Sequence, residues 1–144
     1  MNIETVQLIS DKILFELETF LSEKLTYHGV HHTIDVVQQS LAIAKREGVS
    51  NKEDLFLLQV AALYHDSGFL TTYKDHEKES CKKAMQELPL FNFSEAGIIK
   101  ICGLIQATKI PQQPNNLLEQ IIADADLDYL GRNDFQKISA TLQG

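Results

Sequence analysis

At residues 60–68 the chain reads VAALYHDSG, and the rest of the sequence is best interpreted outward from this stretch. It ends an apolar run that starts near Leu55, in which large side chains recur at helical spacing. A helix with so few polar residues should lie inside the domain, and Gly68 provides a stop for it. His65 and Asp66 lie at its buried end, where a carboxylate is costly unless it is paired or bound to a metal.

Length and composition indicate one ordinary globular domain over residues 1–144. The chain carries a net charge of −7, from 20 acidic and 13 basic side chains, which argues against a nucleic-acid or anionic-membrane surface. No apolar run is long enough to span a bilayer, and the first residues carry no export signal. We expect a cytoplasmic monomer or homodimer with no nucleic-acid or membrane partner. Cys81 and Cys102 are interpreted as reduced, small core residues.

The hydrophobic pattern predicts one helix after another. We expect helices at about residues 3–25, 31–47, 50–66, 76–88, 94–105 and 116–130, with a further short segment at 135–142. The predicted helix starts are marked by capping residues, namely Ser50 with Glu53, Asp75, Ser94, and either Asn115 or Asn116. Gly131 should end the last long helix. No window alternates long enough to indicate a strand, so the prediction is an all-α, single-domain bundle of about six or seven helices.

Three groups of polar side chains do not fit a plain apolar core. They are His28 and His32 before and at a helix start, the His65-Asp66 pair, and the acids Asp124 and Asp126 in an apolar helix. A lone histidine is more often solvated or hydrogen-bonded than a ligand. A spacing of two, however, places successive side chains about 200° apart on a helix, so one of the two later acids must face the interior and needs a cation there. Imidazoles and carboxylates together suit a divalent metal such as Mn, Fe, Zn, Co or Ni rather than Ca.

These residues, in this order, resemble the HD-domain superfamily of metal-dependent phosphohydrolases. The pattern of that family is a histidine, a His-Asp pair and a distant aspartate on a helical bundle. The matching residues, with their flanks, lie in a region of about 24–135 and are His32, His65, Asp66 and Asp126. The resemblance implies that these four hold a divalent metal ion, with Mg added to the possible metals. Asp124 is the rival of Asp126, either as ligand or as the partner that orients a ligating histidine.

Two further histidines are assigned roles by resemblance. The segment from Tyr27 to His32 is similar to the start of the cyclic-nucleotide phosphodiesterase domain, which implies that His28 donates a proton to the leaving oxygen. His76 lies where many HD proteins carry another histidine near the metal. No histidine follows it, so we expect one tightly held ion and, at most, a weak and water-rich second one.

The implied function is hydrolysis of a phosphate ester of a nucleotide or other small phosphorylated metabolite by a metal-activated water. Asp66, or as second choice Asp126, would accept the proton of that water. The basic candidates for phosphate contact are Lys74, Lys78, Lys109 and Arg132, for which a solvated surface position is the simpler interpretation. The candidates for a pocket wall are Phe69, Tyr73 and Tyr129, for which core packing is the simpler interpretation. Two alternatives stay open: a metal-binding signalling or ligand-binding domain with little or no turnover, and a bundle whose polar residues only satisfy one another.

Overall fold

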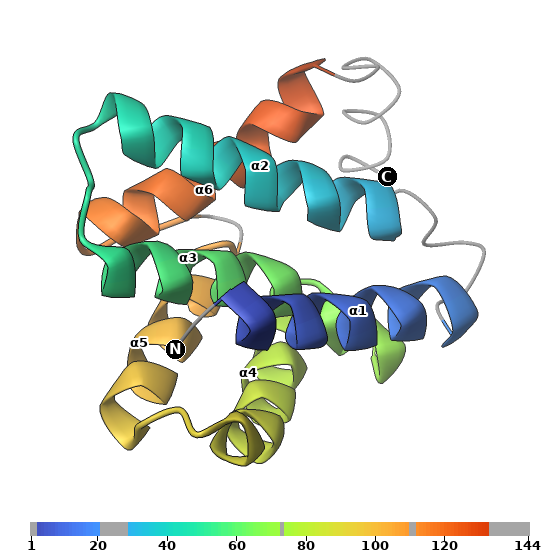
Figure 1. The fold of residues 1–144 in the computed structure, drawn as a ribbon. Coiled ribbons are helices and arrows are strands. Elements are labelled where there is room, and N and C mark those ends of the chain that lie inside the picture. The colour runs from blue at the N-terminus through green and yellow to red at the C-terminus, as the bar shows by residue number, and fades with distance from the viewer. Residues whose placement is uncertain (1–2, 21–28, 73, 110–111, 133–144) are drawn as a thin grey trace.

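The computed structural model of the chain describes residues 3–20, 29–72, 74–109 and 112–132, with only the backbone of residue 3 and of residues 128–132. This part contains six α-helices and two short 3₁₀ helices and no strand, which confirms the predicted all-α fold (Figure 1). In chain order they are α1 (Ile3–Phe20), α2 (Val30–Arg46), α3 (Lys52–Tyr64), η2 (Ser67–Leu70), α4 (His76–Glu87), η3 (Leu88–Phe91), α5 (Glu95–Gln106) and α6 (Leu117–Arg132). None of the described helices is long and apolar enough to cross a membrane. The predicted segment 135–142 and the end of the first predicted helix lie outside the described residues.

Helix α3 is the centre of the bundle, as its composition predicted. It contacts every other α-helix, and Figure 1 shows α2 on one side of it and α4 and α5 on the other. Leu57, Leu58 and the whole run Val60–Tyr64 are buried. Burying one large aliphatic side chain stabilises a fold by about 1.5–3 kcal/mol, so α3 is held from all sides. Its carboxyl end, where His65 and Asp66 follow, is therefore fixed inside the domain.

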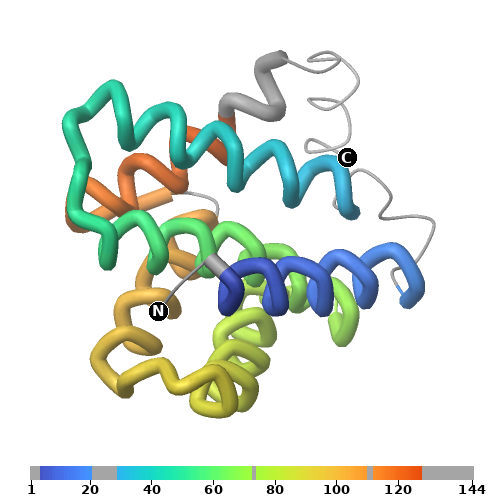
Figure 2. The backbone as a smooth tube through the Cα atoms, in the orientation of Figure 1, coloured from blue at the N-terminus to red at the C-terminus, as the bar shows by residue number. Residues whose placement is uncertain are grey.

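Helix α1 packs onto the bundle along one stripe. Ile9, Ile13 and Leu17 recur every fourth residue and are buried, whereas Leu8 and Phe15 on the same helix are exposed. The helix contacts α2, α3 and η2, and Figure 2 shows its path alongside α3. Its apolar stripe thus serves the domain's own core, and a role in a dimer stays a prediction.

Two helix starts agree with the capping residues expected from the sequence. The Ser94 hydroxyl accepts a hydrogen bond from the Gly97 N–H at 3.1 Å, at the start of α5. Asn116 Oδ1 accepts from the Glu119 N–H at 2.9 Å and so caps α6, which decides between the two asparagines. Each of these bonds satisfies a backbone donor that a helix leaves without an intrahelical partner.

Other predicted helix ends are wrong by one position or in mechanism. Asn51, not Ser50, caps α3, with its side chain accepting from the Asp54 N–H at 3.0 Å. Both residue types cap well, so composition could not choose between these neighbours. Asp75 precedes α4 as predicted but has a left-handed backbone, with φ 56°, and no side-chain capping bond. Helix α6 continues past Gly131 to residue 132.

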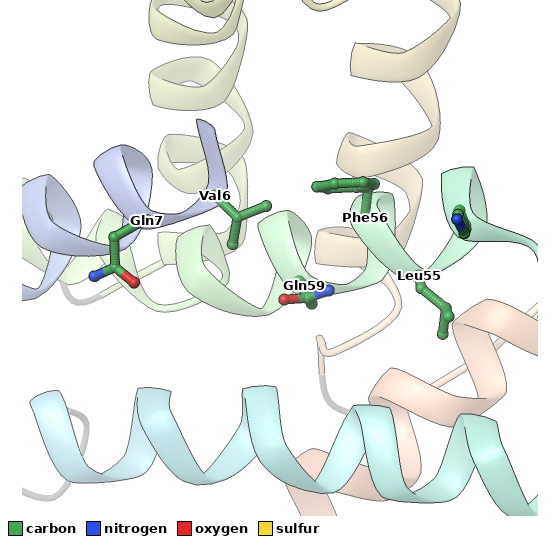
Figure 3. Close-up of a pocket in the computed structure, with 6 residues that line it drawn as sticks. Val6, Gln7, Leu55, Phe56 and Gln59 are labelled. Carbon is green, nitrogen blue, oxygen red and sulfur yellow. The ribbon is translucent and has the colours of Figure 1, made fainter. Parts of the chain in front are cut away.

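A hollow of about 330 Å³ lies between the amino-terminal parts of α1 and α3 (Figure 3). Its lining residues are Val6, Gln7, Lys52, Leu55, Phe56 and Gln59. None of them belongs to the polar groups that the sequence analysis singled out, so this hollow is separate from the candidate site.

A polar cluster links the three helices α1, α3 and α4. The fully buried Tyr64 of α3 donates its hydroxyl to Glu87 Oε1 of α4 at 2.8 Å. Glu87 Oε2 accepts from Lys83 at 2.7 Å and from Lys12 of α1 at 2.9 Å, and both lysines also reach Glu16. Burial raises the pKa of Glu87, but these hydrogen bonds outweigh burial and hold the pKa below its usual value of 4.5.

We predict that Glu87→Gln lowers the free energy of unfolding by about 1–2 kcal/mol at neutral pH, since the two lysines lose their anionic partner. A carboxyl with a lowered folded-state pKa stabilises the fold above its ordinary pKa and loses this effect as the pH falls. The difference between wild type and Glu87→Gln should therefore shrink below pH 4.5. Urea unfolding at neutral pH and below pH 4.5 measures this difference, with Glu79→Gln on the same helix as control. An equal difference under the two conditions would contradict the assignment.

Candidate metal centre

Four side chains from three distant segments converge at the carboxyl end of α3. His32 lies in the first turn of α2, His65 and Asp66 directly follow α3, and Asp126 lies on α6. Helix α2 packs against both α3 and α6, which brings these segments together (Figure 1). His32, His65 and Asp66 are buried, and the Asp126 side chain is 19% exposed. The fold thus collects two imidazoles and two carboxylates almost out of contact with water.

The donor atoms of these side chains have the spacing of a coordination shell. His32 Nε2 lies 3.3 Å from His65 Nε2, 3.1 Å from Asp66 Oδ2 and 3.0 Å from Asp126 Oδ1. His65 Nε2 lies 3.4 Å and 3.5 Å from the same two oxygens. Ligands bound at about 2.0–2.2 Å from one ion are about 3.0–3.5 Å apart when adjacent in octahedral or tetrahedral geometry. These five distances therefore match the edges of one coordination shell.

The two imidazole nitrogens that face each other explain why a cation is needed. His65 Nδ1 lies 2.6 Å from the Ala62 carbonyl oxygen and donates its N–H there. In the neutral ring this leaves Nε2 with a lone pair that points toward His32 Nε2. A backbone carbonyl on the outer nitrogen is the usual way in which proteins orient a metal-binding histidine. His65 is thus prepared as a ligand by the last turn of its own helix.

The electrostatics of the centre favour positive charge. Burial lowers the pKa of His32, but its contacts with Asp126 and Asp66 outweigh burial and raise the pKa to about 10. The pKa of His65 is raised in the same way, against burial, by Asp66 and Asp126. Burial raises the pKa of Asp126, and the two imidazoles more than reverse this and lower it. Without an ion a proton fills the role of the cation, and a metal has to displace it.

Asp124 does not take part in this centre. Its side chain is exposed and accepts a hydrogen bond from Gln120 Nε2 at 2.9 Å, one turn earlier on α6. The alternatives that Asp124 is a ligand or orients a ligating histidine are therefore wrong in this structure. The physical reason is the predicted one, because two residues along a helix turn the side chain to nearly the opposite face.

His76 contacts the centre from α4 without joining the four donors. Its Nε2 lies 3.2 Å from Asp66 Oδ1 and 3.2 Å from Glu77 Oε2, and its ring stacks on Phe69 with centroids 3.8 Å apart. Asp66 thus offers one oxygen to the donor set and the other to His76. Sequence reasoning missed Glu77, which is buried although it lies in a segment rich in charged residues that reads as a surface helix.

The comparisons with known proteins agree with this geometry. The HD domain family matches residues 29–128, more than half of the chain, and this range contains all four donors. The chain belongs to the HD domain family. Its fold is similar to the crystal structure of a "predicted HD superfamily hydrolase" from an uncultured Thermotogales bacterium, with a TM-score of 0.67 and 24% identity over 83% of this chain and 67% of that one. No curated protein matches the chain.

The donors of this HD domain fit a divalent ion. His32, His65 and Asp66 alone place three ligand atoms within 4.8 Å of one another in the interior. The mixture of nitrogen and oxygen suits Mn, Fe, Co, Ni or Zn, and oxygen-preferring Mg less well. A single ion would be held by these three residues and by Asp126, because Asp126 Oδ1 lies as close to His32 as Asp66 does.

The other residues named from the sequence are exposed, buried by packing, or outside the described residues. His28 and Tyr73 are outside, and so are the side chains of Tyr129 and Arg132. Lys74, Lys78 and His31 are exposed, and Lys109 Nζ lies 3.7 Å from Asp75 Oδ1 with both side chains largely in solvent. Phe69 is buried and stacks on the His76 ring, so in this structure its side chain serves packing.

Gly68 acts by close packing and not as the predicted helix stop. Helix α3 ends at Tyr64, and the left-handed glycine of the described chain is Gly48. A Cβ atom on Gly68 would overlap the backbone carbonyl of His76, so only glycine lets η2 approach α4 this closely. The Gly68 N–H donates to Ser80 Oγ at 2.8 Å, and Ser80 Oγ donates to the His65 carbonyl at 2.9 Å. This contact fixes the turn that carries His65 and Asp66.

We predict that Gly68→Ala destabilises the protein by at least about 3 kcal/mol and weakens metal binding, because α4 has to move away from the turn. The matched control is Gly103→Ala in the last turn of α5. An added Cβ there meets nothing closer than Glu119 Oε2 at 3.4 Å, and alanine is the better helix former. Urea unfolding and metal content measure both variants. Equal stability of the two variants would contradict the packing role.

We predict that Asp126→Ala lowers the affinity for a divalent metal more than 100-fold, because it removes one ligand from the shell. Asp124→Ala, two residues earlier on the same helix, should retain wild-type affinity because its side chain points to solvent. Elemental analysis after dialysis and titration calorimetry with Mn²⁺ measure this pair. Loss of metal from both variants, or from neither, would be incompatible with the geometry.

Proposed function

We propose that this HD domain is a metal-dependent phosphohydrolase that acts on a nucleotide or another small phosphorylated metabolite. The observation that carries the proposal is the set of donor–donor distances of 3.0–3.5 Å among His32, His65, Asp66 and Asp126. Membership of the HD domain family, whose resemblance implies phosphate-ester hydrolysis, supports it. When bound, a divalent ion supplies Lewis-acid activation of water and of a phosphoryl oxygen.

Asp66 is the proposed general base, and the position of its two oxygens supports this role. Oδ2 belongs to the donor set that would hold the ion, and Oδ1, which lies 3.2 Å from His76 Nε2, is the oxygen left outside that set. Oδ1 is therefore the oxygen that would accept the proton of the water, and the contact with His76 keeps the carboxylate in one orientation. Asp126 is the second choice as base, since its side chain is the more exposed of the two carboxylates.

The reaction needs two further roles, which are protonation of the leaving oxygen and contact with the phosphate. By resemblance, His28 protonates the leaving oxygen, as histidine titrates near working pH. The candidates for phosphate contact are Lys74, Lys78, Lys109 and Arg132. In this proposal Lys109 leaves Asp75 when substrate arrives, which is inexpensive because an exposed ion pair contributes only about 0–1 kcal/mol.

The second candidate function is a metal-binding signalling or ligand-binding domain with little turnover. The exposure of Lys74 and Lys78, together with the contact of Lys109 with Asp75, favours it, because phosphoryl transfer needs cations close to the developing charge. Both functions require the same metal centre and differ only in turnover.

We predict that protein loaded with Mn²⁺ or Ni²⁺ hydrolyses at least one member of a panel of nucleoside mono-, di- and triphosphates, cyclic nucleotides and bis-p-nitrophenyl phosphate. Asp66→Ala should lose metal and activity together, because it removes a ligand. His28→Ala should keep the metal and lose about 10²–10⁴-fold in turnover, as expected for a general acid.

Released phosphate and p-nitrophenol measure the activity, with Asp124→Ala as the control variant. Stoichiometric metal without turnover of any substrate would favour the binding domain. A wild-type protein that binds no metal, and whose melting temperature a chelator leaves unchanged, would overturn both functions.

A further inference from the structure

Cys81 and Cys102 lie opposite each other where α4 packs against α5. The Cys81 thiol donates to the Cys102 carbonyl oxygen at 3.5 Å, and the Cys102 thiol donates to the Cys81 carbonyl oxygen at 3.7 Å. This reciprocal pattern means that each sulfur lies over the backbone of the other residue. The two positions are 21 residues apart in the sequence, with η3 and the start of α5 between them. Both are free thiols.

The two thiols differ in exposure and in acidity. Cys81 is buried and Cys102 is half-buried. The interaction with Cys102, together with burial, raises the pKa of the Cys81 thiol. The same interaction lowers the pKa of the Cys102 thiol and outweighs the effect of burial there. Cys102 is therefore the thiol that a dissolved reagent can reach, and thiolates rather than thiols react with oxidants.

An open hollow lies next to the pair. A hollow of about 270 Å³ is lined by residues that include Gly103, Gln106 and Ala107 of the α5 end. Gln106 lies one helical turn after Cys102, and its amide lies 3.5 Å from Cys81 Sγ. Gln106 therefore lines the hollow and contacts the Cys81 sulfur at the same time.

We propose that Cys81 and Cys102 form an oxidisable dithiol site, which a low-molecular-weight disulfide such as oxidised glutathione converts into a disulfide between α4 and α5. The Cys102 thiolate attacks one sulfur of the reagent, forms a mixed disulfide and expels one glutathione thiolate. The Cys81 thiol, on losing its proton, then attacks the Cys102 sulfur and expels the second thiolate. The two protein thiols are oxidised, the reagent is reduced to two thiols, and the two cysteine protons end on the released glutathione.

The cysteine pair lies next to the contact that fixes the turn of His65 and Asp66. Cys81 directly follows Ser80, whose hydroxyl contacts the His65 carbonyl and receives the Gly68 N–H. Neither cysteine is a metal donor, so oxidation leaves the donor set intact while it fixes α4 against α5. A disulfide requires Cα atoms about 4.4–6.8 Å apart, so it forms only between residues that are already close neighbours. Helices α4 and α5 pack against each other, and each thiol reaches the backbone carbonyl of the other cysteine.

The test uses the full chain with its metal and oxidised glutathione. Intact mass should fall by the mass of two hydrogens, peptide mapping should join the Cys81 and Cys102 peptides within one chain, and dithiothreitol should reverse both changes. The melting temperature should rise by about 5–10 °C, because the new bond closes a loop of moderate length. Cys81→Ser should instead accumulate one glutathione on Cys102, whereas Cys102→Ser should stay reduced because Cys81 is buried.

Circular dichroism of both serine variants controls for their folding, and the wild-type mass alone decides the main claim. The proposal is overturned if the wild-type protein keeps two free thiols, carries only glutathione adducts, or forms only links between chains, under conditions that oxidise reduced thioredoxin-type dithiols. These readouts involve no substrate, so they stand apart from the proposed hydrolase activity.

Discussion

Two imidazole nitrogens that face each other at 3.3 Å in the interior are the constraint on which the structure depends. Lone pairs at this distance repel, and burial removes the water that would otherwise separate them. Two carboxylates close the same space, so that only a proton or a metal cation makes the arrangement favourable. The packing of α2, α3 and α6 holds these charged groups at one point in the interior of the domain.

The apolar surroundings do the positioning. Helix α3 is buried along its last two turns, so its end cannot shift relative to α2 and α6. The short turn after it is then pressed onto α4 at Gly68 and bonded there by Ser80. Hydrogen bonds to Ala62 and His76 orient the rings and carboxylates that carry the chemistry. The centre therefore has a rigid base of apolar packing and an outer layer of backbone and side-chain contacts.

Much of this could be read from the sequence, and the remainder depends on contacts across the bundle. Periodicity alone placed His65 and Asp66 at the end of a buried helix. The turn of about 200° between residues two apart on a helix showed that the side chains of Asp124 and Asp126 must point in different directions. Helix geometry could not say which of the two acids faces inward, and the family resemblance indicated that it is Asp126. The tight contact of Gly68 with His76, the burial of Glu77 and the meeting of Cys81 with Cys102 involve segments that approach each other only in the folded chain. No local pattern encodes such pairs.

The ligands of the centre come from parts of the chain that are far apart. His32 and His65 are 33 residues apart, and Asp126 lies a further 60 residues beyond Asp66. An ion bound to all of them would act as a cross-link that closes two long loops, and it could not bind the unfolded chain in this way. Its binding free energy therefore adds to the folding free energy. Thermal denaturation and metal release then become one thermodynamic event, and a cell short of the metal would hold less of the protein in its folded state.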